Sequence, residues 1–172
     1  MDKNIHAREA QLRAIEVFSK RPEAAQVLNR GTAQVREGLR CTYEQEGHHL
    51  VIDMPAAIGG SEEGLAPGFY GRAAICSCLA IGIKMTAARE DVRLEAVQIE
   101  IEQDWDNRGV LAMDDASPVP TDTRIAIKVT SSEPRSVLEE IIRRALSSDP
   151  WLLVFKNAQP VSTAVSIAPG VS

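Results

Sequence analysis

The chain has 172 residues and a net charge of −5, with 44% hydrophobic and 25% charged residues. These proportions are ordinary for a soluble globular domain, and nothing in the sequence is basic enough for a protein that binds the phosphate backbone of nucleic acids. No uncharged run reaches the roughly 20 residues of a membrane span, and the N-terminus is too polar for a signal peptide. Three cysteines do not indicate a disulfide framework, so we expect a cytoplasmic protein without a membrane or nucleic-acid partner.

The first 31 residues are predicted to form a helical extension. Apolar residues at helical spacing predict a helix over residues 4–19. Pro22 begins a second short helical piece through Leu28, and Gly31 ends it. The pattern changes after this glycine, so we place the start of the main domain, residues 32–172, at this point.

The next part of the chain has a period of two, which is typical of strands. Residues 39–44 alternate apolar and polar side chains, and a return strand over 50–54 follows a turn. After a glycine-rich loop, Pro67 opens a long apolar helix that we expect to end near Arg89.

Two further strands are predicted over residues 97–102 and 124–129, each with one solvated face, and a loop over 107–120 separates them. Pro134 begins an amphipathic helix.

The last elements begin where Asp149 and Pro150 have the N-cap-then-proline form of a new helix. We expect a final strand over residues 161–167. The whole order of elements predicts an α+β fold with antiparallel sheets.

The long helix carries two of the three cysteines, and its stretch 71–83 is almost uncharged. A helix that is apolar on nearly every face must be covered on nearly every face. The two small sheets of a single chain are too thin to cover every face of this helix. We therefore expect a homodimer, in which a second copy covers the remaining apolar surface. Cys78, in the middle of this helix, is then either a small core residue or an enclosed reactive thiol.

Several landmarks resemble the OsmC/Ohr family of organic-hydroperoxide resistance proteins, over roughly residues 32–170. Their order and spacing carry the resemblance more than any one of them: Asp53-x-Pro55, Gly59-Gly60, Pro67 and Cys78-Leu79-Ala80. Further along, Asp149-Pro150 followed by Gln159-Pro160-Val161 resembles the stretch in which the family carries its second cysteine, as Cys-Pro.

The resemblance implies an intertwined homodimer, with antiparallel sheets wrapped around long central helices and two sites at the subunit interface. In the family, a thiolate on the buried helix attacks a hydroperoxide, and the resulting sulfenic acid forms a disulfide with the second cysteine. An Arg–Glu pair activates the thiolate, and an external dithiol restores it. We expect neither a cofactor nor a metal ion.

This chain departs from the family pattern at two positions. Cys78 matches the first cysteine, but Asp149 stands at the resolving position and Gly68 at the position of the activating Glu. The activating Arg has no clear counterpart. Arg36 and Arg40 are the nearest candidates, and either is equally well explained as a solvated strand residue.

Two functions follow from this pattern. The first is a weak one-cysteine peroxidase, in which Cys78 reacts with a small hydrophobic hydroperoxide and an outside thiol resolves the sulfenic acid. The alternative is a non-enzymatic protein that holds a small hydrophobic ligand in the interface pocket, with Cys78 as part of the lining.

The other candidate residues have simpler structural readings. Cys76 lies two positions from Cys78, and such residues point about 200° apart on a helix, so we interpret Cys76 as core. Cys41, on the apolar side of a strand, reads as core too. An N-cap role explains Asp149, whose carboxylate can accept from the amide of Trp151 or Leu152. Placed near Cys78, that carboxylate would raise the pKa of the thiol.

Overall fold

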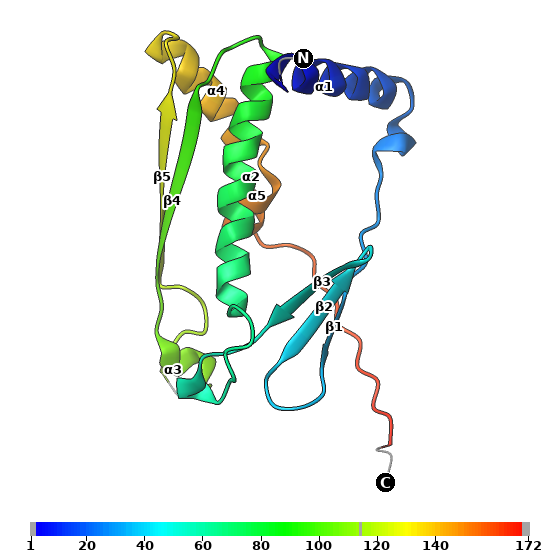
Figure 1. The fold of residues 1–172 in the computed structure, drawn as a ribbon, viewed down its shortest axis with the longest axis vertical. Coiled ribbons are helices and arrows are strands. Elements are labelled where there is room, and N and C mark those ends of the chain that lie inside the picture. Colours follow the sequence, from blue (N-terminus) through cyan, green and yellow to red (C-terminus); the bar gives the residue numbers. More distant parts are fainter. Residues whose placement is uncertain (1–2, 114, 170–172) are drawn as a thin grey trace.

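A long helix, α2 (Pro67–Arg89), forms the axis of the protein (Figure 1). The computed structural model describes residues 3–113 and 115–169. Pro67 occupies the first turn, and at the other end Asp91 has a φ of 60°, which turns the chain out of the helix. Among the described residues, α2 is the one helix long and apolar enough to span a membrane by length and composition alone.

Four elements pack along α2: the helix α1 (Lys3–Lys20), the strand β4 (Ala96–Asp104) and the helices α4 (Arg135–Ser147) and α5 (Pro150–Lys156). Figure 1 shows α1 running across the C-terminal end of α2, with its far half projecting from the body. A short 3-10 helix, Pro22–Ala25, then leads away from α1 toward the first sheet.

The first sheet is an antiparallel meander of β1 (Thr32–Val35), β2 (Cys41–Gln45) and β3 (His48–Ile52). Glu46 and Gly47 join β2 to β3 with φ values of 51° and 78°, which is the backbone of a tight hairpin turn. The sheet lies to one side of the helices (Figure 1). Most of its side chains are exposed.

The second sheet pairs β4 with β5 (Asp122–Thr130), and Ile99 lies opposite Ile127. Half-buried and exposed residues alternate along both strands, as predicted for a sheet with one solvated face. The loop expected over 107–120 contains one short helix, α3 (Asn107–Val110), which Asp106 caps by accepting from the Arg108 amide.

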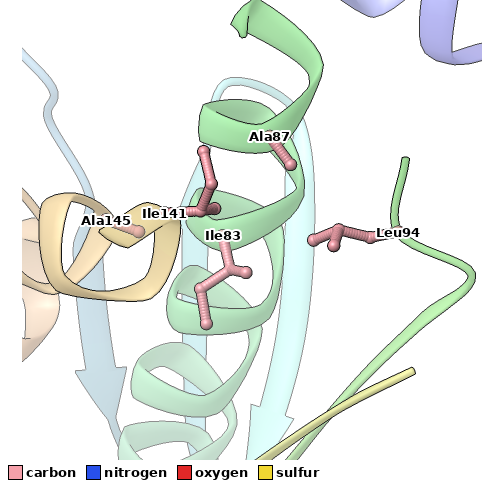
Figure 2. Packing of buried hydrophobic residues seen from close by; sticks show 5 residues of the cluster. All are labelled: Ile83, Ala87, Leu94, Ile141 and Ala145. Atoms are coloured by element: carbon pink, nitrogen blue, oxygen red, sulfur yellow. The ribbon is translucent and has the colours of Figure 1, made fainter. Parts of the chain in front are cut away.

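The core of the described residues is small and lies between α2, α4 and the start of β4. Figure 2 shows Ile83 and Ala87 of α2 facing Ile141 and Ala145 of α4, with Leu94 on the other side. Ile83 and Ile141 are 0% and 1% exposed. The apolar stripe predicted for the helix after Pro134 therefore anchors it to α2.

The expected strand over 161–167 is wrong for the single chain. Residues 157–169 are extended but pair with no described strand, and Val161, Val165 and Ile167 are 81%, 87% and 90% exposed. Alternating side chains suit a strand, yet a strand exists only where another strand supplies hydrogen-bond partners. Within residues 3–113 and 115–169 no strand offers that edge to this segment.

Candidate functional site

Cys78 of α2 lies beside Asp149, the residue that begins α5. Asp149 is 3% exposed, and its Oδ1 accepts from the Leu152 amide at 2.8 Å, which confirms the predicted N-cap. The other oxygen, Oδ2, is buried without a hydrogen bond of good geometry from any described group. A Cβ placed on Gly82 would lie 3.5 Å from Oδ2, an ordinary van der Waals contact, so this carboxylate packs against α2 at Gly82.

The surroundings of Cys78 hold its thiol in the protonated form. Burial is the main cause and raises the pKa of Cys78 above its ordinary value. The Trp151 amide, in the first turn of α5, lowers the pKa, whereas Asp149 raises it through its interaction with the thiol and its negative charge. A nucleophilic thiolate is therefore the minor form at neutral pH.

Gly68 lies on another side of α2, next to Arg72. A Cβ built on Gly68 would be 3.2 Å from Arg72 Nη1, so a longer acidic side chain at this position would meet a guanidinium. Arg72 also acts on Cys76, whose pKa is raised by burial and lowered by the Arg72 charge. Cys76 is only half-buried rather than core.

Arg72 was not among the arginines that the sequence singled out. The available signal was the spacing of Gly68, Arg72 and Cys76, which are one helical turn apart and so share a face. The structure does not bring Cys78 to that face, because Cys78 turns toward α5.

Arg40 is engaged elsewhere in the single chain. Its Nε lies 2.8 Å from Glu63 Oε2, and both side chains are exposed. Among the described residues no arginine contributes to the pKa shift of Cys78. The other candidate, Arg36, lines a polar hollow of about 400 Å³ together with Arg40 and Glu37. The expected placement of both arginines on strands is wrong, because Arg36 and Arg40 lie in the connection between β1 and β2.

A buried carboxylate that sequence reasoning treated only as a landmark organises the loop before α2. Asp53 is 1% exposed and accepts from the amides of Met54, Ser61 and Glu63 at 2.7, 3.0 and 3.2 Å. These hydrogen bonds, that of Met54 first, lower the pKa of Asp53 against the opposing effect of burial. Asp53 thus fixes the approach of the chain to α2.

We predict that Asp53→Asn destabilises the protein by roughly 5–10 °C in Tm at neutral pH, since an amide cannot replace a carboxylate that accepts three backbone hydrogen bonds. The folded pKa of Asp53 lies below its unfolded value, so its contribution is present above about pH 4 and is lost as pH falls through the folded pKa. Thermal unfolding between neutral and acidic pH measures both effects. The matched control is Glu23→Gln, an exposed carboxylate. An equal Tm for Asp53→Asn and wild type would contradict this role.

The site offers a sulfur and a carboxylate for chemistry. Cys41, Cys76 and Cys78 are all unpaired and half-buried, so Cys41 is not core either. Within residues 3–113 and 115–169 no three His, Cys, Asp or Glu side chains gather as a metal site would require. The sulfur of Cys78 beside the carboxylate of Asp149 is an arrangement that can support thiol chemistry.

Comparisons with known proteins agree with the fold. The family described as OsmC-like protein matches residues 59–164. The structure resembles an OsmC-like protein from Mycoplasma pneumoniae, with 11% identity, a TM-score of 0.63 and coverage of 76% of this chain and 89% of that one. No curated protein matches the sequence.

Two further solved structures with this fold are hydroperoxide resistance proteins. An organic hydroperoxide resistance protein OsmC from Legionella pneumophila is 17% identical, with a TM-score of 0.54 and coverage of 76% of this chain and 90% of that one. The corresponding protein from Elizabethkingia anophelis is 9% identical, with a TM-score of 0.52 and coverage of 76% and 89%. The family match spans more than half of the sequence, and the chain belongs to the OsmC-like protein family.

Proposed function

We propose that the protein is a slow one-cysteine thiol peroxidase, in which Cys78 reduces a small hydrophobic hydroperoxide and an outside thiol regenerates it. The observation that carries this proposal is the pairing of Cys78 with Asp149. A carboxylate beside the thiol disfavours the thiolate and offers no second sulfur, so reaction is slow and stops at the sulfenic acid. Membership of a family that contains hydroperoxide resistance proteins supports the substrate class.

The reaction moves two electrons from thiols to the peroxide. The Cys78 thiolate forms an S–O bond with one peroxide oxygen, the O–O bond breaks, and the alkoxide takes up a proton and leaves as an alcohol. An outside thiol then attacks the sulfenic sulfur and releases water, which leaves a mixed disulfide. A second outside thiol attacks the outer sulfur of the mixed disulfide. This releases the Cys78 thiolate and joins the two outside thiols in a disulfide.

We expect Cys78→Ser to lower turnover of cumene hydroperoxide with dihydrolipoamide to background, a loss of about 100-fold or more if Cys78 is the nucleophile. Cys76→Ser is the matched control, because Cys76 lies on the same helix but away from Asp149, and it should retain activity within about twofold. Mass spectrometry after a brief peroxide pulse should locate one added oxygen on Cys78. Oxidation of Cys76 first, or equal loss in both variants, would contradict the proposal.

The turnover and oxidation measurements also test the alternative function, a non-enzymatic protein that binds a small hydrophobic ligand. The raised pKa of Cys78 also favours a lining role in a protein that binds a small hydrophobic ligand without reacting. If the folded wild type gives neither turnover nor oxidation of Cys78 under excess peroxide, the result favours the non-enzymatic binding protein over the peroxidase.

We propose further that the protein is an intertwined homodimer, which would cover surfaces that one chain leaves open. Phe69 and Ile81 of α2 are 47% and 58% exposed, and the first sheet stands beside the helices with little cover (Figure 1). Residues 157–169 have the alternation of a strand and no strand partner among the described residues. The edge of a sheet in a second copy would supply the missing hydrogen bonds.

Light scattering should therefore give a mass of about 37 kDa at micromolar concentration, twice the 18.7 kDa of one chain. Val165→Lys in the C-terminal segment is expected to weaken the dimer, whereas Val27→Lys, equally exposed but in the linker after α1, should not. A monodisperse species near the mass of one chain would rule the dimer out.

A further inference from the structure

The buried carboxylate of Asp149 has one oxygen to which no hydrogen bond is made. The side chain is 3% exposed, and the N-cap of α5 uses only Oδ1, which accepts from the Leu152 amide. Oδ2 is buried and has no hydrogen-bond partner of good geometry among the described residues. A buried carboxylate oxygen without a donor is costly, so this position favours a donor that the resting chain does not supply.

The unpartnered oxygen lies on the Cys78 face of α2. Oδ2 packs against α2 at Gly82, where a Cβ would lie 3.5 Å from it. Cys78 precedes Gly82 by four residues, about one helical turn, so both residues are on one face of the helix. The carboxylate also interacts with the Cys78 thiol itself. An oxygen atom added to this sulfur would therefore lie close to Oδ2.

Oxidation of Cys78 creates the donor that Oδ2 lacks. A sulfenic acid carries an O–H group on the sulfur, and rotation about the Cβ–Sγ bond lets this hydroxyl turn toward the carboxylate. Hydrogen bonds from an O–H group to a carboxylate are short and strong. The side chain of Cys78 is half-buried, so a peroxide reaches the sulfur. The hydroxyl then stays covalently bound to Cys78, and no free ligand has to reach Oδ2.

The same carboxylate opposes the oxidised forms of Cys78 that are anions. Among the described residues, Asp149 is the one charged group that acts on the Cys78 sulfur, and its charge is negative. A sulfenate or sulfinate here would place two negative charges side by side and leave Oδ2 without a donor. The Trp151 amide supplies one donor for the sulfur. One donor and one acceptor match a neutral sulfenic acid.

We propose that Asp149 keeps the sulfenic acid of Cys78 neutral and so protects it from further oxidation, an inference that rests on the proposed peroxidase function. In the second oxidation, the sulfur of the sulfenate forms an S–O bond with one oxygen of another hydroperoxide, and the O–O bond breaks. The alkoxide takes the proton of the transferred oxygen and leaves as an alcohol, and a sulfinate remains. A neutral sulfenic acid is the weaker nucleophile for this step, whereas an outside thiol still attacks its electrophilic sulfur.

Mass spectrometry of Cys78 tests the proposal, with Cys41→Ser and Cys76→Ser in every variant so that Cys78 is the one thiol. One equivalent of cumene hydroperoxide forms the sulfenic acid, and an excess then drives the second oxidation. The rate at which one added oxygen becomes two measures the second step by itself. Asp149→Asn should speed this step about tenfold for each unit by which the pKa of the sulfenic acid falls. Asp106→Asn is the matched control, because Asp106 caps α3, and it should oxidise as the wild type does.

The pH profile of the second step separates the loss of the carboxylate from a looser site. Loss of the negative charge shifts the midpoint of the profile to lower pH, whereas greater access to the sulfur raises the rate at every pH and leaves the midpoint in place. If Asp149→Asn does not fold, Asp149→Ser, which also caps helices, replaces it.

Equal second-step rates in the Asp149 variant and the wild type, or a faster step with an unchanged midpoint, would overturn this proposal and leave the peroxidase function standing. A wild-type protein in which Cys78 takes up no oxygen would overturn both proposals. A faster second step in the Asp149 variant, with the midpoint moved to lower pH, is the result expected.

Discussion

Asp149→Cys should form a peroxide-dependent disulfide with Cys78 that the wild type cannot form. The carboxylate of Asp149 is close enough to act on the Cys78 thiol, and α2 packs directly against α5. A sulfur at position 149 would therefore meet the sulfenic acid of Cys78, and water would leave as the S–S bond forms. Loss of the N-cap should cost about 0.5–2 kcal/mol of stability, which a folded domain tolerates.

Peptide mapping under non-reducing conditions after one equivalent of hydroperoxide measures this disulfide. Ser148→Cys is the matched control, because Ser148 is the exposed neighbour whose hydroxyl donates to the carbonyls of Arg144 and Ala145. It should stay unpaired with Cys78. Should Asp149→Cys fold and remain a free thiol under excess peroxide, the correspondence of position 149 with the resolving cysteine is wrong.

Asp149→Asn should make Cys78 more reactive, by about tenfold at neutral pH for each unit by which the thiol pKa falls. The substitution removes the negative charge that raises the pKa of Cys78, while burial still raises it and the Trp151 amide still lowers it. Asn is as good an N-cap as Asp, so the Leu152 amide keeps an acceptor and the helix is preserved. The pKa of Cys78 should therefore fall, which increases the fraction of thiolate at neutral pH.

The pH dependence of thiolate absorbance and of alkylation by iodoacetamide measures this shift, with Cys41→Ser and Cys76→Ser in the background to isolate Cys78. Asp106→Asn is the control, because Asp106 also caps a helix but lies on α3 beside Arg108. An unchanged or higher pKa of Cys78 in Asp149→Asn would mean that the Asp149 carboxylate does not raise the pKa of this thiol.

The sequence determined the elements whose signals are local. Pro67 marks a helix start because its φ suits a first turn, and Pro134 directly precedes α4 as its N-cap residue. The alternation along β4 and β5 follows from one solvated and one covered face. The cap of Asp149 is local as well, since its acceptor and the Leu152 amide are three residues apart. These features need no knowledge of distant contacts.

The tertiary structure alone decided which side chains meet. Arg40 has no sequence neighbour that would predict its pairing with Glu63, and the amides that Asp53 collects come from both ends of a loop. The strand expected over 161–167 failed for the same reason, because alternation describes the side chains and not the partner strand.

Cys78 shows most clearly which properties follow from the sequence and which depend on the tertiary structure. The sequence placed the thiol on an apolar helix and Asp149 at a helix start, because hydrophobic periodicity and capping chemistry act over a few residues. Only the packing of α5 against α2 places the Asp149 carboxylate beside the Cys78 sulfur, where it helps to raise the pKa of the thiol. Desolvation and charge act through space over a few ångströms, so their sources are known only when the chain has folded.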